Sequence, residues 1–298
     1  MNAASRKEGM RGKLLLNEPM AKHTSWRLGG PADRYYVPAD LEDLQNFLAT
    51  LNDDVDLLWV GLGSNLLVRD GGFRGQVIAP LNALRHIELQ DDGRLYVESG
   101  TSCARLAKFC QKAGLGGADF FAGIPGTVGG ALAMNAGAFG GETWAAVREL
   151  IMIDRHGELH RREVGEFDVG YRHVHLPRAE WFAAALFAFT ARTEGEDSSI
   201  RQLLRQRNAT QPIGEPSCGS VFKNPPGEHA ARLIEAAGLK GHRLGSARVS
   251  DKHANFIISA ADTRAADVEA LIELIRERVA EQFGIELEPE VRIVGEAV

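Results

Sequence analysis

Cysteine is scarce in this sequence, and its cysteines are odd in number. The 298 residues contain three of them, Cys103, Cys110 and Cys218, and no two have a CxxC spacing. An odd number without that spacing indicates neither a disulfide framework nor a zinc site. We therefore expect reduced thiols, which fit a cytoplasmic protein.

Excess positive charge and long apolar segments are lacking too. The net charge is −6, whereas nucleic-acid binding needs clustered Lys and Arg. The longest apolar runs, such as 181–189, fall well below the roughly 20 residues that cross a bilayer. The N-terminal residues show neither a signal-peptide apolar stretch nor a cleavage pattern. We expect a cytoplasmic protein without nucleic-acid or membrane partners, whose phosphate ligands are small molecules.

The composition is that of a folded protein, and strand and helix patterns alternate along the chain without a repeat. Apolar spacing predicts helices over 41–51 after the cap Asp40, from Thr101 or Ser102 to Gly114, from about Ile200, over 230–237, and through 268–279 to a stop at Gly284. Strands are expected at 35–37, 57–60, 77–79, 95–98, 255–259 and 287–294. The polar stretch 194–199 predicts a domain boundary, so we expect a mixed α and β chain of two or three lobes.

A short glycine loop, GLGSN at 61–65, follows one of the predicted strands. Glycines let backbone N–H groups surround phosphate oxygens as an anion nest. The dinucleotide fingerprint of Rossmann folds needs a third glycine and then a helix, but Leu66 stands at that position and the next residues, LLV, resemble a strand. The loop therefore indicates a diphosphate site that is not of the Rossmann type.

A second, longer loop contains seven glycines between Gly123 and Gly141. It has no Lys-Ser or Lys-Thr pair, which excludes a Walker loop. Tight turns alone would explain one such loop, but two long glycine loops together favour a bound dinucleotide. Because both common phosphate-loop templates fail, the residues alone leave the identity of that nucleotide open.

The loop sequences GLGSNLLVRDGGFRG and FFAGIPGTVGGALAMNAGAFGGET together closely resemble the UDP-N-acetylenolpyruvoylglucosamine reductase family, also known as UDP-N-acetylmuramate dehydrogenase or MurB. Six further segments resemble the family in the same order: TSWRLGGPAD from Thr24, YRH from Tyr171, CGSVFKNP from Cys218, AGLKG from Ala237, VSDKHANF from Val249 and LEPEVRIVG from Leu287. The resemblance covers nearly the whole chain. Since 47 residues, 173–219, separate Arg172 from Ser220, the chain resembles the shorter type II branch, which lacks an inserted segment that folds over the substrate.

The resemblance implies an α+β fold. Its first part would be an FAD-binding domain of the vanillyl-alcohol-oxidase (PCMH) type in two α+β subdomains, followed by a C-terminal α+β substrate-binding domain. We expect a lead-in at 1–22, the FAD-binding domain at 23–193 with subdomains of about 23–85 and 86–193, and the C-terminal domain at 194–298.

The resemblance also implies a reaction in peptidoglycan precursor synthesis. NADPH reduces a noncovalent FAD, and the flavin then passes hydride to the vinyl carbon of enolpyruvyl-UDP-N-acetylglucosamine, giving UDP-N-acetylmuramate. These two small molecules are the expected partners, and a monomer is expected. Two alternatives remain open at this point: another flavin oxidase or dehydrogenase of the same fold, and a noncatalytic nucleotide-binding protein.

Three residues match the family's catalytic positions. Arg172 corresponds to the arginine that contacts the substrate carboxylate, Ser220 to the serine that protonates the carbanion, and Glu290 to the glutamate beside the enolate. Taken alone, these residues also fit a surface ion pair, a turn serine and a solvated carboxylate. Cys218 is a fallback proton donor or a packed thiol. Val174 departs from the family, which often has Ser there.

The remaining expected site residues follow the same segments. Contacts to FAD are expected from Gly61, Leu62, Gly63, Ser64, Asn65, Gly123, Ile124, Pro125, Gly126, Thr127, Gly129, Asn135, Ala136 and Gly137. Contacts to the substrate are expected from Tyr171, Lys223, Asn224, Lys240 and Arg292. His173 and His175 have a strand-like spacing but no further ligand completes a metal set, so no metal is expected.

Overall fold

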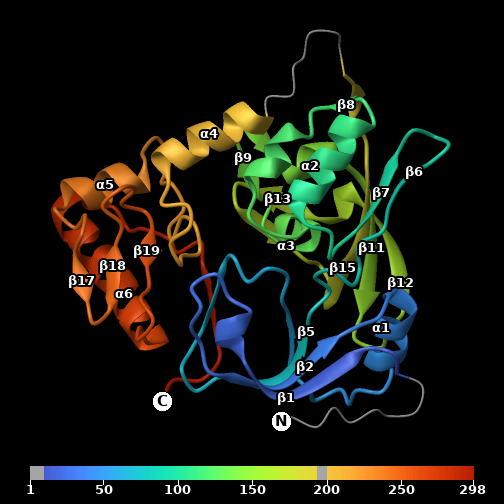
Figure 1. Cartoon of the computed structure of the whole chain (residues 1–298), viewed down its shortest axis with the longest axis horizontal. Helices are drawn as coiled ribbons and strands as arrows, with labels where there is room; N and C mark the ends of the chain where they lie inside the picture. Colours follow the sequence, from blue (N-terminus) through green and yellow to red (C-terminus); the bar gives the residue numbers. More distant parts are fainter. Residues whose placement is uncertain (1–9, 193–199) are drawn as a thin grey trace. The chain divides into compact units, whose positions relative to one another are not determined.

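The computed structural model describes residues 10–192 and 200–298 of the chain (Figure 1). They form two compact units. Unit 1 takes the described residues of Met1–Leu16, Arg34–Leu62 and Gly75–Gln206, and unit 2 takes Asn17–Asp33, Gly63–Arg74 and Arg207–Val298. The domain boundary predicted at 194–199 lies outside the described residues. So do residues 1–9 of the predicted lead-in, whereas the rest of that lead-in contains strand β1 (Lys13–Pro19) and the 3-10 helix η1 (Met20–Lys22).

An antiparallel five-stranded sheet forms the centre of unit 1. Its order is β12 (Leu159–Glu163), β11 (Val147–Asp154), β15 (Glu180–Phe187), β7 (Leu95–Glu98) and β6 (Ile87–Leu89). Successive side chains of a strand point to opposite faces, and in β11 Leu150 and Met152 enter one apolar cluster whereas Ile151 and Ile153 enter another. Because both faces are covered, the run of apolar residues in β11 and β15 is nearly continuous.

Two helices pack on one face of this sheet, α2 (Cys103–Lys112) and α3 (Val128–Ala133) (Figure 1). The hydroxyl of Ser102 accepts a hydrogen bond from the N–H of Arg105 and caps α2, and Gly114 follows the helix with φ 69°. Both signals were predicted from the sequence. Helix α3 was not, because it lies inside the second glycine loop; Thr127 caps it, and Val128, Ala131 and Leu132 bury its inner side.

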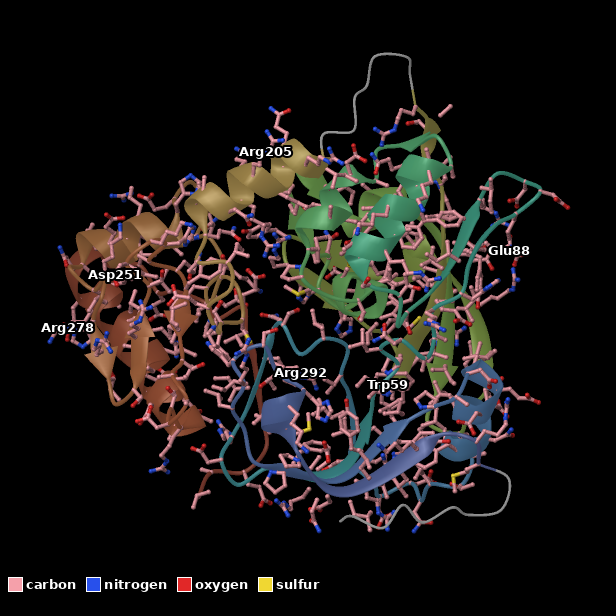
Figure 2. The ribbon with its side chains drawn as sticks, in the orientation of Figure 1. Trp59, Glu88, Arg205, Asp251, Arg278 and Arg292 are labelled. Carbon is pink, nitrogen blue, oxygen red and sulfur yellow. The ribbon has the colours of Figure 1, made fainter. Side chains whose placement is uncertain are left out.

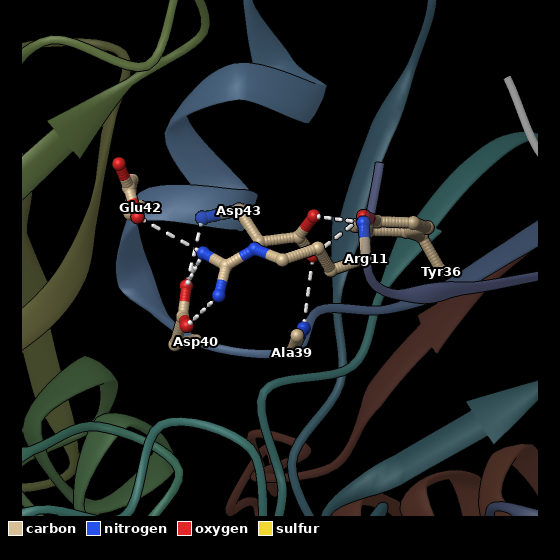
Figure 3. A network of polar contacts seen from close by, with 6 residues as sticks. All are labelled: Arg11, Tyr36, Ala39, Asp40, Glu42 and Asp43. Atoms are coloured by element: carbon tan, nitrogen blue, oxygen red, sulfur yellow. Dashed lines mark hydrogen bonds and ion pairs between the residues drawn. The ribbon is translucent and has the colours of Figure 1, made fainter. Parts of the chain in front are cut away.

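Helix α1 (Leu41–Leu48) covers the other face of the sheet through Leu44, Phe47 and Leu48. Asp40 caps it as predicted, with Oδ1 accepting from the N–H of Asp43 at 2.9 Å. Asp43 itself accepts hydrogen bonds from the hydroxyl of Tyr36 at 2.6 Å and from the N–H groups of Ala39 and Arg11 (Figure 3). Burial alone would raise the pKa of Asp43, but these bonds outweigh it and hold the pKa below its ordinary value.

A second sheet has the order β1, β2 (Pro31–Val37), β5 (Phe73–Ile78) and β3 (Leu57–Trp59). Within unit 1, β3 and β5 run parallel with Leu57 opposite Gln76. Trp59, labelled in Figure 2, stacks on Trp181 of β15 with ring centroids 5.5 Å apart. The strands predicted at 57–60 and 95–98 agree with β3 and β7 to within a residue, whereas those predicted at 35–37 and 77–79 cover only the C-terminal ends of β2 and β5, each of which begins four residues earlier.

Short elements complete unit 1 around the second glycine loop. They are β8 (Leu115–Gly116), η2 (Asp119–Gly123), β9 (Gly137–Ala138), β10 (Gly141–Glu142), η3 (Thr143–Ala146), η4 (Val164–Glu166), β13 (Asp168–Gly170), β14 (His173–His175) and β16 (Thr190–Ala191). Pairing joins β9 to β10, β13 to β14 and β8 to β16, all antiparallel. Helix α4 (Ile200–Thr210) begins where the sequence predicts it and runs past the end of the unit.

Unit 2 is built on the long helix α6 (Ala265–Phe283), which packs against α5 (Ala230–Ala236) and the sheet of β17 (Arg243–Leu244), β18 (Ala247–Val249) and β19 (Ile257–Ile258) (Figure 1). Val268, Leu271, Ile275 and Val279 are fully buried, as their spacing predicts. Gly284 ends α6 with φ 67°.

Unit 2 also contains a pair of parallel strands that are far apart in the sequence, β4 (Leu66–Val68) and β20 (Arg292–Val294). β4 confirms that a strand and not a helix follows GLGSN. The predicted strand at 287–294 was too long, because residues before Arg292 form an isolated bridge, Phe222 with Pro289, and proline has no N–H to continue a ladder. The strand expected at 255–259 shortens to β19.

Candidate active site

The first and second glycine loops meet at Gly61 and Thr127 in unit 1. A Cβ added to Gly61 would lie 3.0 Å from Cγ2 of Thr127 and nearer still to Oγ1. Contacts that short are essentially never made by real side chains, so this approach requires glycine. Thr127 is itself held, since it is 2% exposed and its hydroxyl accepts from the N–H of Gly130.

The backbone of the second loop packs against the residues that follow β7. The N–H of Gly129 donates to the carbonyl of Ser99, and the N–H of Val128 donates to that of Thr101, both at 2.8 Å. A Cβ on Gly129 would lie 2.9 Å from Cβ of Ser99. The N–H groups of Ile124, Gly126 and Gly130 also donate within the protein. Phosphate binding by an anion nest therefore does not use these five N–H groups.

Two hydroxyls beside this loop are buried without a partner. Ser99 and Thr101 are each 1% exposed, and neither hydroxyl has a hydrogen-bond partner in the part of the chain that the structure describes. Buried polar groups are nearly always paired, so an unpaired pair beside the glycine loop fits a ligand with polar atoms. Together with the close approach at Gly61 and Gly129, these residues fit a nucleotide cofactor. Sequence reasoning missed both hydroxyls.

Arg172 occupies the turn between β13 and β14, whose ladder closes with Gly170 opposite His173. Its φ is 52°, a left-handed conformation that costs a residue with a Cβ on the order of 1 kcal/mol and that glycine or asparagine usually takes. The strained position is held from outside the turn. Nη1 of Arg172 donates to the carbonyl of Asn135 at 3.1 Å and Nη2 to that of Gly137 at 2.9 Å.

The arginine therefore lies against the second glycine loop. Asn135 is buried and also left-handed, with φ 46°, and a Cβ on Gly137 would lie 3.2 Å from Nη1 of Arg172. Tyr171 is about half exposed, and its ring centroid lies 5.2 Å from the guanidinium carbon of Arg172. A planar guanidinium fixed by two carbonyls suits recognition of a carboxylate.

Ser220 and Glu290 lie in unit 2 on two segments that are joined by a backbone hydrogen bond. The N–H of Glu290 donates to the carbonyl of Val221 at 2.7 Å, and Nδ2 of Asn65 donates to the carbonyl of Glu290 at 2.9 Å. The end of the GLGSN loop thus contacts the residue that precedes β20 by two positions. Ser220 and Glu290 are both partly buried.

The backbone after Ser220 is fixed by a buried amide that the sequence analysis did not single out. Asn255 is 4% exposed; its Oδ1 accepts from the N–H of Phe222, its Nδ2 donates to the carbonyl of Phe222, and its own carbonyl accepts from Val221. Gly219, with φ 74°, turns the chain just before Ser220. These bonds fix the backbone next to Ser220 and so limit the positions that its side chain can take.

Cys218 is packed and not poised for proton transfer. It is 3% exposed, and its Sγ donates to the carbonyl of Leu66 at 3.4 Å. Burial raises the pKa of its thiol to about 12. This favours the packed-thiol interpretation over the fallback proton donor.

Most residues expected to contact the substrate already have protein partners. Lys223 pairs with Glu288 at 2.6 Å and Lys240 with Glu235 at 3.0 Å. Oδ1 of Asn224 accepts from the N–H of Ala230 at the start of α5. Arg292, labelled in Figure 2, is exposed on β20, and its N–H donates to the carbonyl of Asn65. Lys223 and Lys240 would therefore have to break these ion pairs before they could bind a phosphate of the substrate.

The other expected FAD contacts differ in exposure. Leu62 and Pro125 are exposed, Ser64 and Gly126 are partly buried, and Gly63, Gly123, Ile124 and Ala136 are buried. A Cβ on Gly63 would clash with the carbonyl of His23 within unit 2. The buried members of this set therefore shape the loops, and only the more exposed ones can offer a side chain to a ligand.

Two further features lie apart from these residues. The ligand atoms of Asp154, Glu158 and His160 lie within 4.8 Å of one another at the turn between β11 and β12. Oδ1 of Asp154 accepts from the N–H groups of His156 and Glu158, and Oδ2 lies 3.0 Å from Nε2 of His160, so turn stabilisation explains the group.

An open hollow of about 350 Å³ in unit 2, between residues 237–242 and the second half of α6, contains none of the expected site residues.

Among residues 10–192 and 200–298, none of the helices has both the length and the apolar character that crossing a membrane requires.

Comparison with known proteins identifies both parts of the chain. A model of an FAD binding domain matches residues 32–162, and a model of the C-terminal domain of UDP-N-acetylenolpyruvoylglucosamine reductase matches residues 211–294. The chain is 58% identical over 287 residues to UDP-N-acetylenolpyruvoylglucosamine reductase of Alkalilimnicola ehrlichii, covering 96% of each protein. It is 57% identical over 289 residues to that of Methylococcus capsulatus, covering 96% of this chain and 95% of the other.

A solved structure agrees with these relatives. The crystal structure of UDP-N-acetylenolpyruvylglucosamine reductase from Thermus caldophilus superposes with a TM-score of 0.80 at 34% identity, covering 95% of this chain and 99% of that one. The matches confirm the predicted α+β fold of an FAD-binding domain followed by a C-terminal domain.

Proposed function

The chain belongs to the UDP-N-acetylenolpyruvoylglucosamine reductase family, and on that premise we propose that it reduces enolpyruvyl-UDP-N-acetylglucosamine to UDP-N-acetylmuramate with electrons from NADPH. The observation that carries this proposal is the position of Arg172. A left-handed arginine is held by two carbonyls of the second glycine loop, so a cation stands against the segment that we assign to FAD.

The reaction needs a cation at this position. Hydride addition to the vinyl carbon pushes negative charge onto the neighbouring carbon and its carboxylate, and a fixed positive group stabilises that charge without reorganising. Arg172 binds the carboxylate through its planar guanidinium. Its bonds to Asn135 and Gly137 hold the plane of the guanidinium before the substrate arrives.

Ser220 and Glu290 complete the proposed chemistry. Ser220 donates the proton to the carbon that carries the charge, although a serine hydroxyl is a weak acid and depends on its surroundings. Glu290 lies on the segment bonded to Val221, and as a protonated carboxyl it would donate a hydrogen bond to the enolate. The hydrogen bonds of Asn255 and Asn65 fix the two backbone segments that carry these side chains.

A noncovalent FAD, when bound, supplies the hydride that it has received from NADPH. We assign it to the residues of the two glycine loops named above, 61–65 and 123–137. The buried hydroxyls of Ser99 and Thr101 support that assignment, because a ligand would satisfy them. Tyr171, Lys223, Asn224, Lys240 and Arg292 remain the proposed contacts of the sugar nucleotide.

The proposed organisation follows from the same assignment. Residues 23–193 would form the FAD-binding domain, with subdomains of about 23–85 and 86–193, and residues 194–298 the substrate-binding domain; the matched ranges 32–162 and 211–294 fall inside them. We propose a monomer in the cytoplasm, where the three free cysteines stay reduced and where peptidoglycan precursors are made.

The test is a steady-state assay on the purified protein. We expect a yellow protein whose flavin is released by denaturation, and NADPH oxidation that depends on the enolpyruvyl sugar nucleotide. Mass spectrometry should find one product, heavier than the substrate by two hydrogens, per NADPH consumed. Oxidation of hydroxy acids or sugar alcohols with oxygen and without nicotinamide would instead indicate an oxidase of the same fold. Protein purified without flavin would indicate a noncatalytic binder.

A further inference from the structure

Residues 142–144, which directly follow the second glycine loop, are bonded to the residues that hold Arg172. Glu142 lies opposite Gly137 in the ladder of β9 and β10. The N–H of Thr143 donates to the carbonyl of Ala136 at 3.0 Å, and the N–H of Trp144 donates to Oδ1 of Asn135 at 3.1 Å. Residues 142–144 therefore fix residues 135–137, which supply both carbonyls that bind the guanidinium.

Within this segment, the side chain of Glu142 makes a contact of its own. Its Oε2 accepts a hydrogen bond from Nδ2 of Asn135 at 3.1 Å. The same Nδ2 donates to the carbonyl of Gly170 at 3.1 Å, directly before the turn that carries Arg172. The Asn135 amide thus bridges Glu142 to the base of that turn, while the Asn135 carbonyl contacts the guanidinium.

Asn135 needs such support. It is 3% exposed, so water does not readily replace a lost partner, and its φ of 46° is strained. A carboxylate acceptor gives a stronger hydrogen bond than a neutral one. Without Glu142, the amide keeps its bonds to Gly170 and Trp144 but loses its one charged acceptor, so it is held by two hydrogen bonds instead of three.

We propose that Glu142 is a positioning residue, which holds the Asn135 carbonyl in place and thereby aims the guanidinium of Arg172 at the substrate carboxylate. This inference rests on the proposed function. It predicts that Glu142 affects the step that uses Arg172 and leaves flavin reduction by NADPH unaffected.

The test is anaerobic stopped-flow absorbance of the flavin-loaded protein. For Glu142→Ala we expect reoxidation by the enolpyruvyl sugar nucleotide to slow by about tenfold, because a misplacement of an ångström or less is costly at a reacting centre. Bleaching by NADPH should stay within about twofold of wild type, since it does not use Arg172. Glu142→Gln keeps an acceptor oxygen and should restore most of the reoxidation rate.

A matched control comes from the same unit. Glu166 is a partly exposed carboxylate that pairs with Arg178 and accepts from the N–H of Glu163. Its side chain thus has the same kinds of contact as that of Glu142, but its partners are Arg178 and Glu163 and not Asn135. Glu166→Ala should therefore leave both half-reactions at wild-type rates, and an equal slowing of reoxidation in this variant would assign the Glu142 effect to general loosening of the fold.

A double-mutant cycle separates this inference from the proposed function. If Glu142 acts through Arg172, Glu142→Ala adds little to the slowing caused by Arg172→Ala. An additional tenfold slowing in the Arg172→Ala background, or a Glu142→Ala protein that reoxidises at the wild-type rate, would overturn the positioning role. If Arg172→Ala itself reoxidises normally, the proposed role of Arg172 is wrong.

Discussion

Replacing Gly61 by alanine tests the contact between the two glycine loops. The added Cβ would lie 3.0 Å from Cγ2 of Thr127 and nearer still to Oγ1, whereas ordinary contacts begin near 3.4 Å. Thr127 cannot simply rotate away, because its hydroxyl caps α3 through the N–H of Gly130 and the side chain is buried. The loops must therefore part by several tenths of an ångström or more.

Overpacking of this kind costs about 1–3 kcal/mol. If the closed arrangement of the loops holds the cofactor, the free protein relieves the strain by letting them part, and the cost falls on binding. FAD should then bind roughly 5- to 150-fold more weakly. The assay is fluorescence titration of flavin-free protein with FAD, with circular dichroism to verify the fold.

Gly130→Ala is the matched control, since its added Cβ would lie 3.6 Å from Oγ1 of Thr127, an ordinary contact. This variant should bind FAD as tightly as wild type. Adding Thr127→Ala to Gly61→Ala removes the two closest atoms, leaves Cβ of residue 127 at 3.2 Å, and should recover part of the affinity. Unchanged FAD affinity in Gly61→Ala would refute the assignment of this contact to the cofactor site.

Three other predictions address the chemistry, the acid limit and the thiols. Ser220→Ala should bleach normally with NADPH but reoxidise at least about a hundredfold more slowly with substrate in stopped-flow. Hydrogen bonds hold the pKa of the Asp43 carboxyl below its ordinary value of 3.8, although burial alone would raise it. The ionised carboxylate therefore stabilises the fold above that ordinary value, and this stabilisation is lost as the pH falls through the lower pKa of the folded state. The melting temperature of Asp43→Asn should accordingly fall less than that of wild type between about pH 5 and pH 3. Burial raises the pKa of Cys103, Cys110 and Cys218 to about 12, so iodoacetamide at about pH 8 should label them only after unfolding.

Each of these has an outcome that contradicts it. Equal reoxidation rates in Ser220→Ala and wild type would remove Ser220 as the proton donor. An acid transition in Asp43→Asn as steep as that of wild type would mean that other carboxyls dominate it. Rapid labelling of any thiol in the native protein would show that the buried packing opens readily.

Local signals in the sequence predicted the helix ends well. Asp40, Ser102 and Gly284 act within one turn of the helix that they begin or end, so their effect is readable without the rest of the fold. The 3.6-residue spacing of α6 likewise reports burial directly. Strand extents were less predictable, because they depend on a partner: Pro289 removes one ladder bond, and nothing local shows where β20 begins.

The candidate site, too, was predictable from the sequence only in part. Resemblance selected Arg172, Ser220 and Glu290, but no pattern in YRH shows that Arg172 takes a left-handed turn position held by Asn135 and Gly137. Those partners lie 37 and 35 residues away in the sequence. Ser99, Thr101, Glu142 and Asn255 were missed for the same reason, since each matters through contacts that only the folded chain creates.

The most direct test of the proposed function is one anaerobic titration of the wild-type protein followed by its absorbance spectrum. We expect NADPH to bleach the flavin, and enolpyruvyl-UDP-N-acetylglucosamine then to restore the oxidised spectrum with one UDP-N-acetylmuramate formed per flavin. A flavin that NADPH does not bleach, or a bleached flavin that this sugar nucleotide leaves reduced, would contradict it.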